Sequence, residues 1–306
     1  MKKTVFILCG LLAIAGFLTP PLALAAGLAV ALTLGNPYEN FSSKASKKLL
    51  QWSVVGLGFG MNLAAVWAAG KTGFSLTVCT IFGTLLAGWL IGKVLRIDPE
   101  TSLLISSGTA ICGGSAIAAV GGVLNADKRA MSVSLGTVFV LNAAALFLFP
   151  MIGKLLQMEQ QDFGLWAAIA IHDTSSVVGA AAKYGDQALE VATSVKMARA
   201  LWIFPITIGL AFYKRKSTGP VNFPWFILWF LAAAAVCTLF PQGEPFYGWI
   251  KFAARRGLTL TLFFIGANLS REAIKSVGIR PLIQGVLLWI LISTTTLLAI
   301  EWPHIR

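Results

Sequence analysis

Apolar segments of about 20 residues recur along the whole of this 306-residue chain, with only short polar breaks between them. A helix of that length and composition can cross the hydrocarbon core of a bilayer. Charged residues make up 12% of the sequence, about half the share in a soluble protein. The sequence therefore predicts an all-α polytopic membrane protein, with residues 1–306 forming a single transmembrane domain.

The polar breaks divide the chain into about eleven candidate spans. They lie near residues 4–19, 20–35, 51–70, 74–94, 102–124, 130–153, 164–182, 188–213, 222–240, 248–269 and 281–300. With the N-terminus on the inner side, fourteen lysines and arginines fall at inner span ends and eight at outer ends. The positive-inside rule therefore favours a cytoplasmic N-terminus.

The first 35 residues allow two interpretations. Lys2 and Lys3, the apolar run after them and residues 23–25 (ALA) match a secretory signal peptide with a cleavage site. The apolar character continues to Leu34, however, and residues 19–21 (TPP) stand where a tight turn between two spans would lie. The uncleaved hairpin is the favoured interpretation.

Lys196 and Arg199 lie in the middle of an otherwise apolar segment. A charge at the bilayer centre costs about 2.5–3.5 kcal/mol on insertion scales, so such residues indicate function by default. Their spacing of three puts them on one helix face, and a guanidinium fork beside an ammonium group suits an oxyanion. The alternative is that Asp173 neutralises one of them in a structural ion pair, which leaves the other cation without a partner.

Five adjacent polar residues, His172 to Ser176, interrupt a second apolar segment. Asp173 is the only acid well inside a predicted span, and a buried carboxylate must be paired or protonated. Thr174, Ser175 and Ser176 offer hydroxyl groups to a ligand, and His172 can exchange a proton near neutral pH. A structural polar network between helices is the alternative.

Gly113, Gly114 and Ser115 lie inside a third apolar segment. Adjacent glycines cost about 1 kcal/mol each in a helix interior. One use for them is a break in the helix, because the second half then presents free N–H groups and partial positive charge to an anion. Close packing between helices through small residues is the alternative.

Two pairs of segments resemble each other faintly. Residues 145–150 (ALFLFP) resemble residues 200–205 (ALWIFP), and Ala110, Ile111 and Ser115 resemble Ala170, Ile171 and Ser175. Transporters are often built from repeats that hold the substrate at their interface. In the count of eleven spans, however, the paired segments run in the same direction, so they do not by themselves indicate an inverted repeat.

Residues 108–117 (GTAICGGSAI), 171–178 (IHDTSSVV) and 196–202 (KMARALW) together resemble the signatures of the YeiH-like bacterial inner-membrane proteins, a family labelled as sulfate exporters. The resemblance covers most of the chain and is strongest between residues 100 and 210. It implies kinship with bile-acid symporters and sodium/proton antiporters. This kinship in turn implies two inverted five-helix repeats with broken crossing helices, plus one extra N-terminal helix, in the bacterial cell inner membrane.

We therefore expect a secondary active transporter of a small anion, with sulfate as the leading candidate. The residues expected to bind it are Lys196, Arg199, Gly113, Gly114, Ser115, Thr174, Ser175 and Ser176. His172 and Asp173 would orient the basic pair or couple a proton. The chain has no ATP-binding loop, so a gradient, of protons or sodium for example, would drive transport.

Other partners and activities are less favoured by the sequence. We expect no cofactor, no metal site and no nucleic-acid partner. The sequence is compatible with both a monomer and a homo-oligomer. The first alternative function is a sodium/proton-type antiporter using Asp173 and Lys196. The second is an intramembrane enzyme using Ser175 or Ser176 with His172, but residues this close on one helix make a nucleophile–base contact awkward. The chain is therefore expected not to be an enzyme.

Overall fold

The computed structural model describes residues 2–61, 63–214, 225–268 and 278–305, and every regular element in these ranges is a helix. The elements are α1 Lys2–Ala15, α2 Pro20–Thr33, α3 Glu39–Gly58, α4 Leu63–Val94, α5 Pro99–Ala110, α6 Gly114–Leu124, α7 Lys128–Leu155, α8 Gln160–Ala170, α9 Thr174–Tyr184, α10 Asp186–Ala200, α11 Ile203–Lys214, α12 Trp225–Leu239, the short 3-10 helix η1 Pro241–Gly243, α13 Glu244–Ala267 and α15 Ile279–Ile305. Four segments are long and apolar enough to cross a membrane: Phe74–Val94, Arg129–Leu155, Asp186–Leu210 and Ile279–Ile300. The all-helical membrane class is confirmed, whereas several of the eleven predicted spans take another form.

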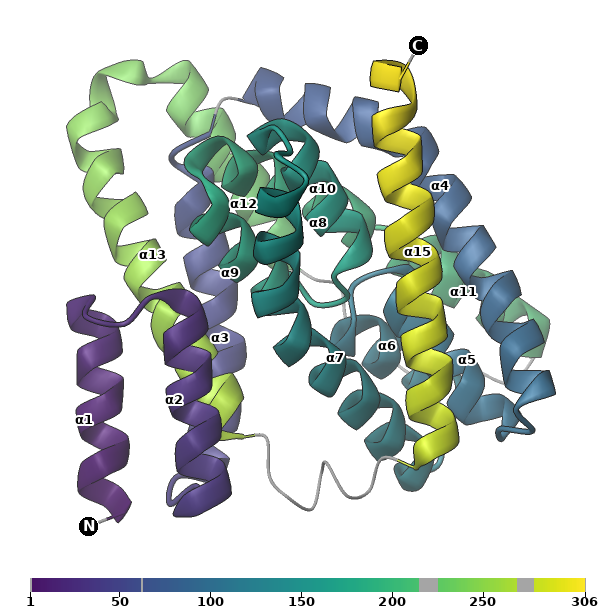
Figure 1. Ribbon diagram of the computed structural model, residues 1–306. Coiled ribbons are helices and arrows are strands. Elements are labelled where there is room, and N and C mark those ends of the chain that lie inside the picture. Colours follow the sequence, from purple (N-terminus) through teal and green to yellow (C-terminus); the bar gives the residue numbers. More distant parts are fainter. Residues whose placement is uncertain (1, 62, 215–224, 269–277, 306) are drawn as a thin grey trace.

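The helices form two groups that lie side by side in Figure 1. In the first group, α13 packs against α1, α2 and α3, and α12 packs against α3. The backbones of α2 and α13 touch at Gly27 and Gly266, where a Cβ atom would collide with the main chain of the other helix. The second group holds the remaining helices, with α5 and α8 near its centre, and it contains the candidate site.

The N-terminal hairpin differs in length from the prediction. α1 and α2 are 14 residues each, shorter than the roughly 20 residues that a span needs. Their turn at Gly16 lies against the side chain of Arg256, about halfway along α13. Ala25 lies inside α2, so cleavage there would divide a helix that packs along α13. The predicted spans 4–19 and 20–35 are therefore a short hairpin on the side of the first helix group.

The predicted span 51–70 is also absent as a continuous helix. α3 ends at Gly58, and α4 begins at Leu63. In Figure 1 the first turns of α4 run across the top of the molecule before the helix descends along its right-hand side. The apolar composition of this region made two differently oriented helices look like one span.

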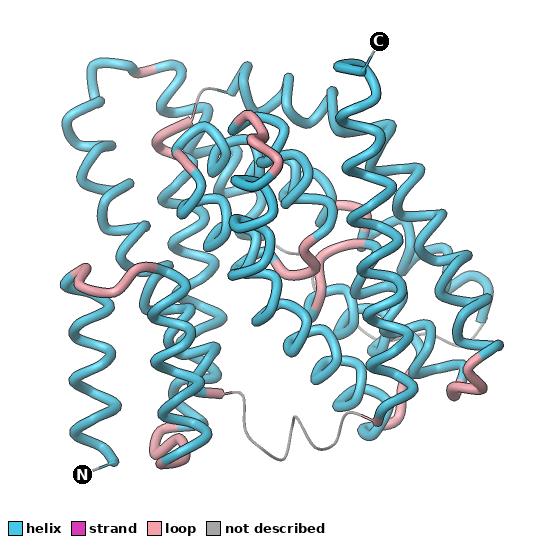
Figure 2. The backbone as a smooth tube through the Cα atoms, viewed as in Figure 1, coloured by secondary structure: helices cyan, strands magenta, loops and turns pink. Residues whose placement is uncertain are grey.

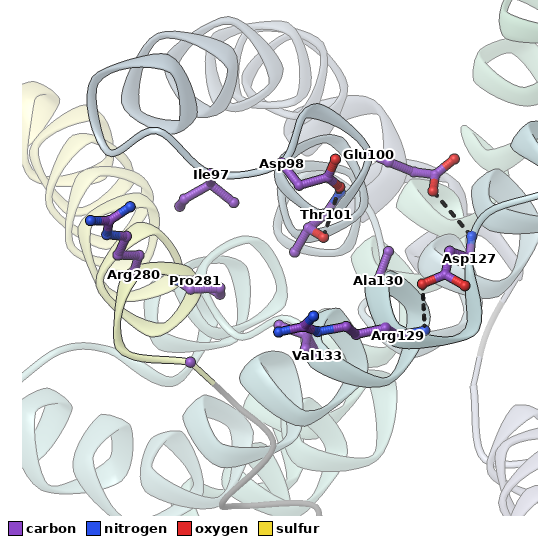
Figure 3. Close-up of a pocket in the computed structure, with 11 residues that line it drawn as sticks. Ile97, Asp98, Glu100, Thr101, Asp127, Arg129, Ala130, Val133, Arg280 and Pro281 are labelled. Atoms are coloured by element: carbon purple, nitrogen blue, oxygen red, sulfur yellow. Dashed lines mark hydrogen bonds between the residues drawn. The ribbon is translucent and has the colours of Figure 1, made fainter.

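The largest departure concerns the predicted span 102–124, which is a hairpin formed by α5 and α6. Ile117 packs over Gly108, and Leu104 lies against Gly121, as expected for antiparallel neighbours. At the open end, the backbone N–H of Asp127 donates to the carboxylate of Glu100 over 3.1 Å. The segment therefore returns to the face from which it starts (Figure 3).

The predicted span 164–182 is a second hairpin, formed by α8 and α9. The rings of Phe163 and Tyr184 stack with their centroids 3.7 Å apart, and the Tyr184 hydroxyl donates to the carbonyl of Met158 over 2.6 Å. Gln160 accepts a hydrogen bond from the backbone N–H of Gln187 over 3.1 Å. The first residue of α8 therefore lies beside the first turn of α10. The start of α8 and the end of α9 are consequently on the same face of the bundle.

α7 runs from one face of the bundle to the other and joins the two hairpins. The α5–α6 hairpin consequently enters from the face that holds the N-terminus, and the α8–α9 hairpin enters from the opposite face. Their tips lie among the helices, as the loop segments at the centre of Figure 2 show. The echoing segments of the sequence therefore run in opposite directions, and the prediction that they run in the same direction was wrong.

Candidate functional site

The tip of the first hairpin is the unwound segment of residues 111–113. Gly113 has φ +68° and ψ −126°, a conformation that side chains disfavour, and it stands before the first turn of α6. A Cβ atom there would lie 3.2 Å from the Cα of Asp173 at the other tip. The predicted helix break is therefore present, and its glycine also lets the two tips touch.

The tip of the second hairpin is the unwound segment of residues 171–173, and Asp173 caps the helix that follows it. One carboxylate oxygen of Asp173 accepts hydrogen bonds from the backbone N–H of Ser175, over 3.0 Å, and from the Ser175 hydroxyl. An acid at this position also compensates the positive end of the α9 dipole. In the described parts of the chain Asp173 forms no ion pair with Lys196 or Arg199, whereas Arg255 pairs with Asp186.

Lys196 lies on α10, fully buried, and caps the end of α8. Its ammonium group donates to the carbonyl oxygens of Ile171, over 2.7 Å, and Ala168, over 3.2 Å. These carbonyls belong to the last turn of α8 or follow it directly, where helical partners run out. The cation is therefore stabilised by the negative end of a half-helix.

Arg199, one turn further along α10, has the same role for the other hairpin. Its Nε donates to the carbonyl of Ala110, the last residue of α5, over 2.8 Å, and Nη1 reaches the hydroxyl of Thr80 over 3.4 Å. Nη2 is buried and has no hydrogen-bond partner in the described parts of the chain. Lys196 and Arg199 thus share one helix but reach two different hairpins.

Four half-helix ends meet at this crossing, and their charges are not fully balanced. The C-terminal ends of α5 and α8 each carry about −0.5 charge, and the N-terminal ends of α6 and α9 about +0.5. Arg199 and Lys196 occupy both negative ends, while Asp173 occupies the α9 end. The N-terminus of α6 has only Gly113 as its cap residue, with no side-chain hydrogen bond. One positive helix end and a net positive charge are therefore left for a ligand.

The other predicted site residues lie around the same crossing. Ser115 is exposed in the first turn of α6, next to Gly114, whereas Thr174 and Ser176 are buried in the first turn of α9. His172 is fully buried, and neither ring nitrogen has a hydrogen-bond partner among the residues that the structure describes. Ser175 and Ser176 consequently make no contact with His172 of the kind that a serine nucleophile needs.

Two residues at the crossing were missed in the sequence, Asn142 and Thr80. Asn142 is the only amide in the predicted span 130–153, and its Oδ1 accepts a hydrogen bond from the backbone N–H of Asp173 over 3.2 Å. Its Nδ2 is buried without a partner in the described ranges. An isolated amide in a long apolar helix is the signal that marks Asn142 in the sequence.

A cavity of about 480 Å³ lies at the other end of α5, between the start of α5 and the start of α7 (Figure 3). Asp98 and Asp127, on its wall, cap α5 and α7 by accepting from the N–H groups of Thr101 and Arg129 over 2.9 and 3.1 Å. α5 is 12 residues long, about 18 Å, so this cavity is separate from the crossing of the tips.

Comparison with known proteins places the chain in a family of membrane proteins. The family model described as conserved hypothetical protein 698 matches residues 11–285. UPF0324 membrane proteins of Bacteroides thetaiotaomicron and Porphyromonas gingivalis are both 56% identical to it, over 290 and 288 residues, covering 94% and 92% of this chain and 88% and 86% of theirs. That of Bdellovibrio bacteriovorus is 49% identical over 312 residues, covering 99% of this chain and 96% of its own.

No solved structure matches the chain. The relatives are named as membrane proteins, in agreement with the apolar helices of the structure. The match across most of the chain agrees with the resemblance to the YeiH-like proteins. The chain belongs to the family described as conserved hypothetical protein 698.

Proposed function

We propose that this protein is a secondary active transporter of a small anion, which binds where the two hairpin tips meet. One observation carries the proposal. Lys196 and Arg199 already occupy the negative ends of α8 and α5, so the position left open is the positive N-terminal end of α6. Backbone N–H groups at a helix N-terminus bind oxyanions in many proteins.

Sulfate is the leading candidate for the anion. The N–H groups of the first turn of α6, at Gly114 and Ser115, the Ser115 hydroxyl and the free Nη2 of Arg199 are donors of the type that a tetrahedral oxyanion accepts. Lys196, which is hydrogen-bonded to the end of α8, contributes its positive charge. Thr174, Ser175 and Ser176 complete the polar surroundings on α9.

The geometry gives less support to a cation antiporter. A sodium ion needs carbonyl or carboxylate oxygens, but the carbonyls of Ala110 and Ile171 accept hydrogen bonds from Arg199 and Lys196. One oxygen of Asp173 is likewise engaged by Ser175. Within the proposal, His172 and Asp173 remain the candidates for coupling a proton, because both lie at the second tip beside the basic pair.

We place the N-terminus in the cytoplasm and the protein in the bacterial inner membrane. Described basic positions near helix ends toward the face that holds the N-terminus are Lys2, Lys3, Lys44, Lys47, Lys48, Lys93, Arg96, Lys128, Arg129, Lys214 and Arg280, and those toward the other face are Lys71, Lys154, Lys183 and Lys251. Arg255 and Arg256 lie halfway along α13. Eleven against four supports this orientation by the positive-inside rule. The opposed hairpins with their following helices, residues 99–155 and 160–214, are our proposal for the inverted repeat.

Counterflow of labelled sulfate into proteoliposomes tests the function. Purified protein should exchange external labelled sulfate for internal unlabelled sulfate, and empty liposomes should not. The same vesicles are then tested with phosphate, sulfonates and carboxylates, and with sodium across a range of pH. Sodium-dependent pH changes that need no anion would contradict the proposal and favour the antiporter.

A further inference from the structure

We propose that Asn142 of α7 is a direct ligand of the anion and donates to it from Nδ2. This inference rests on the proposed function and adds a residue that neither the family resemblance nor the charge pattern assigns. Asn142 is 3% exposed, and its side chain lies against the tip of the second hairpin.

Asn142 and Arg199 occupy reciprocal positions in the structure. α7 follows the α5–α6 hairpin in the chain, and its Asn142 binds the backbone of Asp173 at the tip of the other hairpin. α10 follows the α8–α9 hairpin, and its Arg199 binds the carbonyl of Ala110 at the end of α5. Each long helix therefore holds the tip of the hairpin that belongs to the other half.

Each of these two side chains uses only some of its polar atoms to hold the opposite hairpin tip. In each, one buried NH₂ group has no hydrogen-bond partner in the described parts of the chain. Asn142 engages Oδ1 and leaves Nδ2, and Arg199 engages Nε and Nη1 and leaves Nη2. A buried donor without an acceptor is unfavourable, so two of them at one crossing indicate that something else accepts. Both groups are donors, which an oxyanion satisfies and a metal cation does not.

A purely structural role would need only half of the Asn142 side chain. The oxygen alone is enough to accept from the Asp173 N–H, so the amide nitrogen is not needed to hold the tip. The amide nitrogen has a use only if it donates to something outside the described contacts. Replacing that nitrogen while keeping the oxygen therefore separates the two roles.

The test is the affinity for sulfate of purified Asn142→Asp protein, measured by isothermal titration in detergent, beside the wild type. The variant keeps an oxygen for Asp173 and loses the donor, and loss of a hydrogen bond to a charged group predicts about 10- to 100-fold weaker binding. Asn125→Asp makes the same change at an exposed position on the cap of α6 and should bind as the wild type does. Asn142→Ser removes Nδ2 without adding charge, because the serine hydroxyl ends one bond short of the Nδ2 position. It is the deciding variant, since the aspartate also adds a negative charge that repels the anion.

The outcomes distinguish the inference from the function on which it rests. Wild-type affinity in Asn142→Ser or in folded Asn142→Asp would overturn the inference alone. A wild-type protein that binds neither sulfate nor another oxyanion would overturn both. Weak binding in both Asn142 variants together with normal binding in Asn125→Asp is the result that we expect.

Discussion

Arg199 donates from Nε to the carbonyl oxygen of Ala110 over 2.8 Å, and this contact joins α10 to the end of a helix 89 positions earlier in the chain. Three positions before it, Lys196 makes the equivalent contact with the end of α8. A cation in a membrane interior needs a partner, which is either an acidic side chain or a backbone carbonyl. Here helix ends fulfil that role, so the cations both stabilise the crossing and leave it positively charged.

The contacts of Lys196 predict that its main role is to hold the tip of the second hairpin. Lys196→Met keeps the length of the side chain but leaves the carbonyls of Ala168 and Ile171 without donors, which should cost about 1–3 kcal/mol each if water does not replace them. Thermal unfolding in detergent should show a clear decrease in Tm. Lys183→Met, at an exposed position near the end of α9, should change the stability by less than about 0.5 kcal/mol.

Sulfate binding should fall less than 10-fold in Lys196→Met, because both of the lysine contacts are with the protein. An unchanged Tm together with complete loss of sulfate binding would show that the ammonium group belongs to the ligand instead.

Arg199→Lys tests the guanidinium fork at constant charge. A lysine can reach one carbonyl but cannot hold Ala110 and Thr80 and also present a free donor. We expect sulfate affinity to fall by about 10-fold or more, since a charge-assisted hydrogen bond is lost. The matched control is Arg255→Lys, whose ion pair with Asp186 lies at the surface and is worth at most about 1 kcal/mol. Equal affinity in the two variants would exclude Arg199 Nη2 as a ligand.

Gly113→Ala should disrupt the contact between the two tips. The backbone at Gly113 has φ +68° and ψ −126°, and a Cβ atom would press on Asp173, so we expect a loss of about 1–3 kcal/mol in stability. Gly122→Ala is the control on the same helix, because a Cβ there meets no atom within 4 Å. That change should be neutral or stabilising by up to about 1 kcal/mol. Differential scanning fluorimetry of both variants measures the contrast, and equal Tm values would contradict it.

The sequence predicts the composition of the crossing much better than the path of the chain through it. The cost of burying ions identifies Lys196, Arg199 and Asp173, and the cost of glycine in a helix identifies Gly113, because both costs are local properties of single residues. Hydropathy cannot distinguish one helix of 23 residues from two of 11 that fold back, since both bury the same apolar surface. The antiparallel packing of Gly108 on Ile117, which decides between them, is a non-local contact.

The same distinction explains why the partners of Lys196 and Arg199 were not predicted. The carbonyls of Ile171 and Ala110 are main-chain groups that every residue carries, so the sequence does not mark them. They become acceptors only because α8 and α5 end there. Partners of this type become visible when the helix ends are known.

The hairpin topology itself can be tested by cysteine labelling in sealed vesicles. Lys93→Cys, Arg129→Cys and Glu159→Cys are introduced singly at exposed positions after Cys9, Cys79, Cys112 and Cys237 have been replaced by alanine. Because α5 and α6 return to the face where they begin, the positions 93 and 129 should react with a membrane-impermeant maleimide from the same side. Position 159, beyond α7, should react from the opposite side.

If instead the chain crossed the membrane eleven times, positions 129 and 159 would each lie on the opposite side from the one expected here. Position 129 would then lie across the membrane from position 93, and position 159 would lie on the side of position 93. Vesicles of both orientations, with labelling compared before and after detergent, distinguish the two patterns without any knowledge of the substrate. If position 129 is labelled from the side opposite to position 93, the α5–α6 segment crosses the membrane, and the two tips cannot meet as opposed hairpins.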